Sequence, residues 1–197
     1  MQQHYRMNDL AFYFNEGWHH IISLDALDHQ LFIIALAAVY LLKNWKQVLI
    51  LVTAFTIGHS ITLALSIFDI VRVNEKWVEF LIPCTIIITA IFNLFKNDFD
   101  KSKLNLHYFF ALFFGFIHGL GFANTIRFML VKNQSIGLCL FGFNVGLEAG
   151  QILIVSIVLT ASYLIVNVAG LKRKWWVVGL SGTTLIFAIK FAVNRIP

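Results

Sequence analysis

Long apolar runs, separated by short polar connections, limit how this chain can fold more than any other feature. Each run has about 20 residues, the length of helix that crosses the hydrocarbon core of a bilayer. Only 13% of the residues are charged and the mean hydropathy is +0.78, whereas about 25% of the residues of a soluble domain are charged. We therefore predict an all-α, polytopic membrane helix bundle with about six transmembrane helices, at approximately residues 26–42, 47–69, 77–95, 107–128, 136–166 and 175–194.

The segment before the first run has a different character. Residues 8–22 are polar at both ends and carry Phe12, Phe14 and Trp18, a pattern typical of an amphipathic helix lying in the membrane interface. The stretch from Met1 to Trp18 lacks the features of a signal peptide, so we expect insertion to begin with the first span. With this interfacial helix, residues 1–197 are predicted to form a single integral membrane domain.

The net charge of +5 does not indicate nucleic-acid binding, because the basic residues form no patch. They stand in small groups between the apolar runs, as in the positively charged cytoplasmic loops of membrane proteins, where anionic lipid is the counter-charge. The densest group is Lys172, Arg173 and Lys174, in the connection after the fifth span. This group predicts that both termini lie outside the cytoplasm.

Ionisable residues at the start of the first span point to chemistry inside the membrane. Asp25, Asp28 and His29 stand at i, i+3 and i+4, so they share one helical face. His20 precedes them at the end of the interfacial helix. An N-terminal cap would explain one of the carboxylates, but it would not explain an Asp beside a His.

Two further histidines lie within spans. His59 stands in the second span beside Ser60, with hydroxyl-bearing neighbours that could satisfy it as an ordinary buried histidine. His118 lies near the middle of the fourth span and has no polar neighbour within a turn. It therefore needs a partner on another helix.

The fifth span carries a polar stripe of Asn144, Glu148 and Gln151, at i, i+4 and i+7. A charged, unpaired Glu148 in a bilayer is very costly, so it is protonated, hydrogen-bonded or bound to a cation. Together, the histidines and carboxylates favour a metal site over a purely structural network. Imidazole and carboxylate ligands suit Ni, Co, Zn or Fe(II), and the absence of thiolates argues against Cu(I). Cys84 and Cys139 lie in apolar runs and are interpreted as buried small side chains.

Small residues recur every four positions in the fourth and fifth spans. Gly142, Gly146 and Gly150 form a GxxxGxxxG ladder, and Gly115 and Gly119 form a second GxxxG pair. This spacing lets helix backbones approach closely in lipid. We expect these helices to pack tightly against neighbours.

The polar motifs resemble those of the HupE/UreJ family of small membrane proteins. The likeness runs over approximately residues 17–155. It rests on His20, Asp28-His29-x-Leu-Phe, Phe-Thr-x-Gly-His59-Ser-x-Thr-Leu, Gly-x-x-His118-Gly-Leu-Gly-Phe and Gly-x-Glu148-x-x-Gln151. The first motifs are also similar to the His/Asp and Gly-His-Ser motifs of the nickel/cobalt permeases.

This resemblance implies a secondary transporter for Ni²⁺ or Co²⁺. We expect it in the bacterial inner membrane, where the basic triplet predicts that both termini are periplasmic. Membrane lipid and the metal ion are the implied partners, nucleic acid is not, and a homo-oligomer is left open. The metal ligands that the resemblance implies are His20, Asp28, His29, His59, His118 and Glu148. From the residues themselves we add Asp25, which we expect to capture metal at the outer entrance with His20 and Asp28. The supporting polar residues are Ser60, Asn144 and Gln151.

Two other functions remain compatible with these residues. An intramembrane hydrolase could hold Zn²⁺ with an open position for water, and Asp28 or Glu148 would serve as its general base. Ser60 would then polarise the substrate. An accessory protein could instead bind the metal without moving it.

Overall fold

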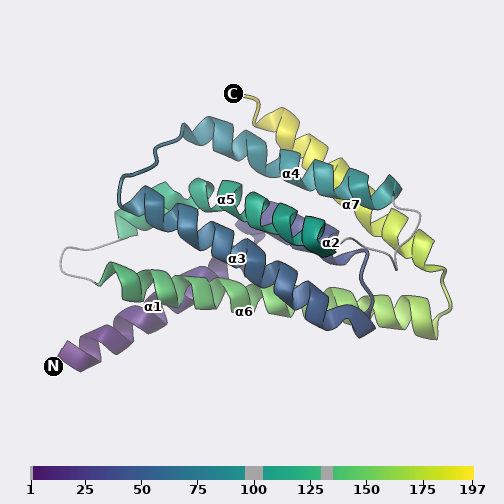
Figure 1. Cartoon of the computed structure of the whole chain (residues 1–197), viewed down its shortest axis with the longest axis horizontal. Coiled ribbons are helices and arrows are strands. Elements are labelled where there is room, and N and C mark those ends of the chain that lie inside the picture. Colours follow the sequence, from purple (N-terminus) through teal and green to yellow (C-terminus); the bar gives the residue numbers. More distant parts are fainter. Residues whose placement is uncertain (1, 96–103, 130–134) are drawn as a thin grey trace.

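The chain folds into a bundle of helices (Figure 1). The structure, a computed structural model, describes the backbone of residues 2–95, 104–129 and 135–197, and contains no strand over these residues. In chain order the elements are α1 (Gln2–Ile22), η1 (Leu24–Ala26), α2 (Leu27–Ala37), η2 (Leu42–Asn44), α3 (Trp45–Ile67), α4 (Glu75–Phe95), α5 (Leu104–Met129), α6 (Ile136–Ser162), η3, a π-helix (Tyr163–Val168), and α7 (Arg173–Asn194). The predicted all-α membrane bundle is confirmed.

The glycine ladder of α6 forms a close contact with α1. A Cβ atom added to Gly146 would collide with the backbone carbonyl of Phe14, and one added to Gly142 would lie 2.9 Å from the carbonyl oxygen of Leu10. Gly17 of α1 meets the backbone of Phe143 in the same way. The contacts advance together along both helices, so α1 and α6 run parallel. Small residues allow this approach, as the GxxxG spacing predicts.

A second glycine contact joins α3 to α5. Gly58 faces the carbonyl of Leu112, while Gly115 faces the carbonyl of Phe55. One turn further on, Gly119 packs on the backbone of His59. The tight packing of α3 and α5 therefore fixes the position of His59.

The third group of helices is α2, α4 and α7, held together by a buried amide. The Asn93 side chain, on α4, donates to the carbonyl of Ala35 at 2.7 Å and to the hydroxyl of Ser181 at 3.3 Å. Ala35 lies in the last turn of α2, and Arg173 donates to the carbonyl of Val39 just beyond it. Side chains from α4 and α7 thus satisfy carbonyls that the end of a helix leaves open.

These contacts explain a difference from the sequence prediction. The first span was predicted over residues 26–42, but α2 ends at Ala37 and has only 11 residues. Its length is about 16 Å at 1.5 Å per residue, about half of the hydrocarbon thickness. The other predicted spans each coincide with a helix to within a few residues.

The chain bends sharply between α1 and α2. Asp9–Ile22 and Leu24–Ala37 meet at 57°, and together they are long and apolar enough for one broken span or a re-entrant pair. Gln30 provides donors for the backbone carbonyls that the end of α1 leaves open. Its amide nitrogen donates to the carbonyls of Ile21, Ile22 and Ser23 at 3.0, 3.1 and 2.8 Å. Broken helices occur at membrane depth where they line a cavity or protein interior.

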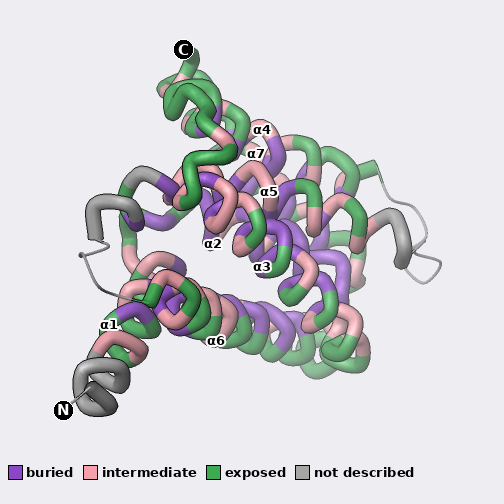
Figure 2. The backbone as a smooth tube through the Cα atoms, turned by 60° about the vertical axis from the view of Figure 1, so that its left-hand side comes forward, coloured by how far each residue is buried: buried purple, intermediate pink, exposed green. Residues whose placement is uncertain are grey.

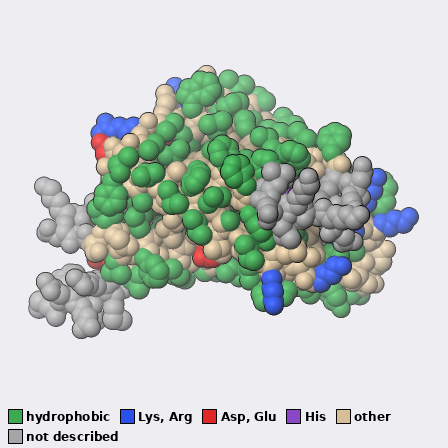
Figure 3. Space-filling view, in the orientation of Figure 1, with side chains coloured by type: hydrophobic (Ala, Val, Ile, Leu, Met, Phe, Trp, Pro, Cys, Tyr) green, Lys and Arg blue, Asp and Glu red, His purple; other side chains and the backbone are tan. Residues whose placement is uncertain are grey.

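Four helical segments of the described chain can each cross a membrane by length and composition: Leu42–Ile67, Glu75–Phe95, Ile136–Val168 and Arg173–Asn194. The bent pair is a fifth, and the apolar part of α5, His107–Ala123, is shorter. Buried residues line the spaces between helices, and exposed residues lie on the outer faces (Figure 2). The face in Figure 3 is broadly hydrophobic, with Lys and Arg toward its ends. The interfacial position of residues 8–22 stays a prediction, although α1 packs along α6.

Candidate metal centre

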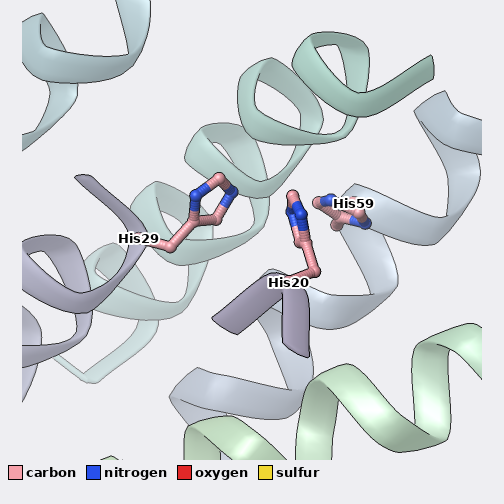
Figure 4. Close-up of side chains that lie close together, drawn as sticks. All are labelled: His20, His29 and His59. Carbon is pink, nitrogen blue, oxygen red and sulfur yellow. The ribbon is translucent and has the colours of Figure 1, made fainter. Parts of the chain in front are cut away.

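Three histidines from three different helices meet inside the bundle. His20 ends α1, His29 begins α2 and His59 lies in α3. Each offers a ring nitrogen, and these nitrogens all lie within 4.8 Å of one another. Figure 4 shows the three side chains close together, with His20 between His29 and His59. Their arrangement depends on the break after α1, which brings His20 and His29 together although they are far apart on a regular helix.

The neighbouring carboxylate fixes the orientation of the His29 ring. Asp28 Oδ1 lies 3.0 Å from His29 Nδ1 and also accepts the His29 backbone N–H at 2.8 Å. A carboxylate can only accept, so Nδ1 carries the proton and Nε2 keeps its lone pair. His29 Nε2 is buried and has no hydrogen-bond partner. This is the arrangement in which a carboxylate holds a metal-ligating histidine.

The other two histidines also present unpaired nitrogens. His20 Nε2 and both ring nitrogens of His59 are buried without a hydrogen-bond partner, and the His59 side chain is completely buried. A buried polar group without a partner costs about 1–3 kcal/mol, so several in one place require an explanation. Neutral imidazoles are preferred here, because several buried cations would repel one another. Their lone pairs are free for a metal ion.

His118 stands behind His29, with ring centroids 4.9 Å apart. Its Nε2 lies 3.1 Å from the hydroxyl of Thr85, and that hydroxyl donates its proton to the carbonyl of Ile82. His118 Nε2 is therefore the donor, and its buried, unpaired Nδ1 keeps the lone pair. His118 adjoins the three-histidine cluster without belonging to the set of nitrogens within 4.8 Å.

Aromatic rings enclose the cluster. Phe122 lies 4.0 Å from His20 between ring centroids, and Phe143 lies 6.1 Å from His59. Phe32 and Phe55 flank His118 at 5.1 Å each. These rings pack around the imidazoles and hold them in place, and such an apolar surround tunes a metal site. Phe32, Phe55 and Phe122 stand in the family motifs, but the rings were not predicted to belong to the site, because a phenyl ring offers no metal ligand.

A cavity of about 350 Å³ leads to the cluster. His20 and His29 line it, and so do the acidic residues Asp25, Glu16 and Glu79. Asp25 lies in η1, at the break itself, and is exposed. The cavity thus has carboxylates along its wall and imidazoles at its inner end.

A basic residue also reaches this cavity. Arg195, just after α7, donates to Asp28 Oδ2 at 3.0 Å. In the sequence, Arg195 is simply a basic residue near the end of an apolar run. No local pattern relates it to Asp28, because the two are 167 positions apart.

The polar stripe of α6, Asn144, Glu148 and Gln151, does not belong to the histidine cluster. Glu148 accepts a hydrogen bond from Thr53 at 2.6 Å, and buried Gln151 accepts one from Thr56 at 2.8 Å. Asn144 donates to the carbonyl of Leu140. Ser60 donates to the carbonyl of Thr56 at 2.6 Å. Among the described residues, none of these side chains joins the group of ligand atoms around His20.

The fold and the site define a class of protein: a helical integral membrane protein with a buried histidine cluster at a break in one of its helices. A family model described as HupE / UreJ protein matches residues 1–195, and the chain belongs to this family. Membership implies metal transport. No curated protein and no solved structure matches the chain.

Proposed function

We propose that the chain is a secondary transporter for a divalent transition metal, Ni²⁺ or Co²⁺, and that the metal binds to His20, His29 and His59 during transport. The observation that carries this proposal is the set of three buried ring nitrogens within 4.8 Å of one another. Imidazole is a good ligand for Ni²⁺ and Co²⁺. His118 is the neighbour to which the ion passes next.

The cavity supports a route to the cluster. Asp25, Glu16 and Glu79 line it, and carboxylates with water attract divalent cations without fixing their geometry. At the inner end, neutral imidazoles replace water around the ion. Nitrogen ligands bind more weakly than thiolates would, which suits a site that has to release its cargo. Protons compete for the same lone pairs, so metal release is coupled chemically to proton uptake.

We infer the orientation of the chain in the membrane from the positive charge of its connections. His59 lies about two turns before the end of α3 at Ile67, on the side of the bundle where α4 and α6 begin (Figure 1). The triplet Lys172 to Lys174 lies at the opposite end, before and within the first turn of α7. With that triplet cytoplasmic, the cluster lies in the outer half of a bacterial inner membrane and both termini are periplasmic. A reporter fused after Pro197 tests this, and a cytoplasmic signal would contradict it.

The zinc hydrolase alternative finds no support in the described residues. Glu148 is hydrogen-bonded to Thr53 away from the histidines, so it is not placed to act as their general base. Asp28 has both carboxylate oxygens engaged, by His29 and Arg195. Ser60 donates to its own helix backbone.

The test is metal uptake by purified protein in sealed liposomes, read by a metal-sensitive dye inside them. Wild-type protein is expected to carry Ni²⁺ or Co²⁺ inward, and His20→Ala and His59→Ala are expected to abolish uptake. His107→Ala is the matched control, because His107 lies beside Tyr40, with its Nδ1 3.2 Å from the Tyr40 hydroxyl, and belongs neither to the cluster nor to the lining of this cavity. Equal loss in His107→Ala, or retained uptake in His20→Ala and His59→Ala, would refute the assignment.

Elemental analysis of the same preparations separates transporter from enzyme. Exchangeable Ni or Co that mild chelation removes supports a transport site. Stoichiometric Zn that survives chelation and disappears in His59→Ala would instead support the zinc hydrolase as the function.

A further inference from the structure

Arg195 lines the cavity that we propose as the route of the metal to the cluster. Its guanidinium lies 3.0 Å from Asp28 Oδ2 and 3.5 Å from the carbonyl oxygen of Glu79. Its terminal carbon also stands 5.5 Å from the ring centre of Phe191, a cation–π contact. The side chain is 30% exposed, against 10% for Asp28. A positive charge is thus held at the wall of a cavity whose other charged residues are acidic.

The contacts of Asp28 leave it no free oxygen. Oδ1 accepts from the backbone and the ring of His29, and Oδ2 accepts from Arg195. Each oxygen of this carboxylate thus has at least one donor, and its charge is paired with that of Arg195. Removing Arg195 would leave one oxygen free and one negative charge uncompensated beside the histidines.

We propose that Arg195 is a positioning residue that keeps Asp28 out of the ligand set of the transported metal, so that imidazoles alone hold the ion. This inference rests on the proposed function. Arg195 acts as a tethered cation: it neutralises the carboxylate that would otherwise bind the incoming divalent ion. Asp28 then serves only to orient the His29 ring.

For transport, the consequence is that Arg195 limits how tightly the site holds the metal ion. An uncompensated carboxylate strengthens the attraction of a partly buried site for a divalent ion, because opposite charges interact strongly where water is largely excluded. Such a site would fill readily and empty slowly. Three neutral imidazoles with a neutralised Asp28 exchange their ion faster. Arg195 therefore favours release over storage.

The experiment measures Co²⁺ binding to the purified full-length chain in detergent, by calorimetry and by the visible spectrum of the bound ion. Arg195→Gln is expected to tighten binding by about tenfold or more and to change the spectrum as an oxygen ligand joins the nitrogens. Arg195→Lys keeps the charge and is expected to resemble wild type. Adding Asp28→Asn to Arg195→Gln removes the carboxylate and is expected to reverse the gain.

Arg72→Gln is the matched control, because Arg72 also pairs with an aspartate, Asp69, but on the exposed surface. It is expected to leave Co²⁺ binding unchanged. A gain of affinity cannot come from damage to the fold, so it separates positioning from a merely structural role. Arg195→Met provides a second uncharged variant if Arg195→Gln does not fold.

The outcomes distinguish the two proposals. Wild-type protein that binds no Co²⁺ overturns the transport site and this inference with it. Wild-type protein that binds Co²⁺, while Arg195→Gln binds it equally or more weakly with the same spectrum, overturns the role of Arg195 alone.

Discussion

Gly146→Ala adds a single methyl group at the contact between α1 and α6, and the geometry allows its effect to be worked out. The new Cβ would lie 2.8 Å from the carbonyl carbon of Phe14 and 3.0 Å from its Cα. Both are backbone atoms, so no side chain can turn aside. Restoring an ordinary contact of about 3.4 Å with the carbonyl carbon requires a separation of about 0.6 Å. The Cβ meets the carbonyl oxygen of Phe14 even more closely, which raises the required separation to more than about 1 Å.

That separation matters because α1 carries His20. Metal sites tolerate changes of about 0.2 Å in ligand distance, so a shift of about 1 Å weakens one of three ligands. Overpacking of this kind costs about 1–3 kcal/mol, and about 1.4 kcal/mol corresponds to tenfold in affinity. We expect Gly146→Ala to lower the unfolding temperature and to weaken Co²⁺ binding about tenfold.

The assay is thermal unfolding in detergent together with Co²⁺ titration, with Gly137→Ala as control. Gly137 lies on the same helix, and a Cβ added there meets no atom within 4 Å. Exchanging Gly for Ala in a helix gains up to about 1 kcal/mol, so the control is expected to be neutral or stabilising. Identical behaviour of the two variants would refute the close-packing argument.

Three other variants or conditions test further contacts. Glu148→Gln should leave Co²⁺ affinity unchanged in titrations, since Glu148 is hydrogen-bonded to Thr53 and is not part of the histidine cluster. A loss of affinity would show that Glu148 is a metal ligand. Asn93→Ala should lower the free energy of unfolding by about 1–3 kcal/mol, because Ala35 and Ser181 lose a buried donor; an unchanged unfolding temperature would contradict this. The amount of bound Co²⁺, measured in titrations at several pH values, should fall as the pH falls and recover as it rises, because protonation removes imidazole lone pairs. Co²⁺ binding that does not change with pH would exclude histidine ligands.

The helices and most site histidines could be predicted from the sequence for simple reasons. A run of about 20 apolar residues has few alternatives to a membrane helix. An ionisable residue inside such a run is costly, so its presence there is enough to mark a candidate site. His29, His59 and His118 were singled out in this way, and His20 by its place in the family motif.

Other features depend on which helices meet, and no local pattern contains that information. Gly146 and Glu148 are two residues apart, so they differ by about 200° around the helix. Since Gly146 faces α1, Glu148 lies on another face of the helix, where it accepts a hydrogen bond from Thr53 of α3. Its role as a metal ligand stays a prediction. Asn93 of α4 satisfies the carbonyl of Ala35 in the last turn of α2, and Arg195 pairs with Asp28.

The cap that Gln30 forms over the end of α1 has a consequence for biosynthesis. It stabilises the break between α1 and α2, so that they form two separate helices, and α2 alone is too short to cross a bilayer. The partner of α1 is α6, whose ladder begins at Gly142, so it is made much later in synthesis. We expect the N-terminal helix to dock only after α6 has entered the membrane. A chain stopped before Ile136 should leave α1 open to protease, whereas the full chain should protect it. The first part of this protein to be made would then be among the last to reach its final place.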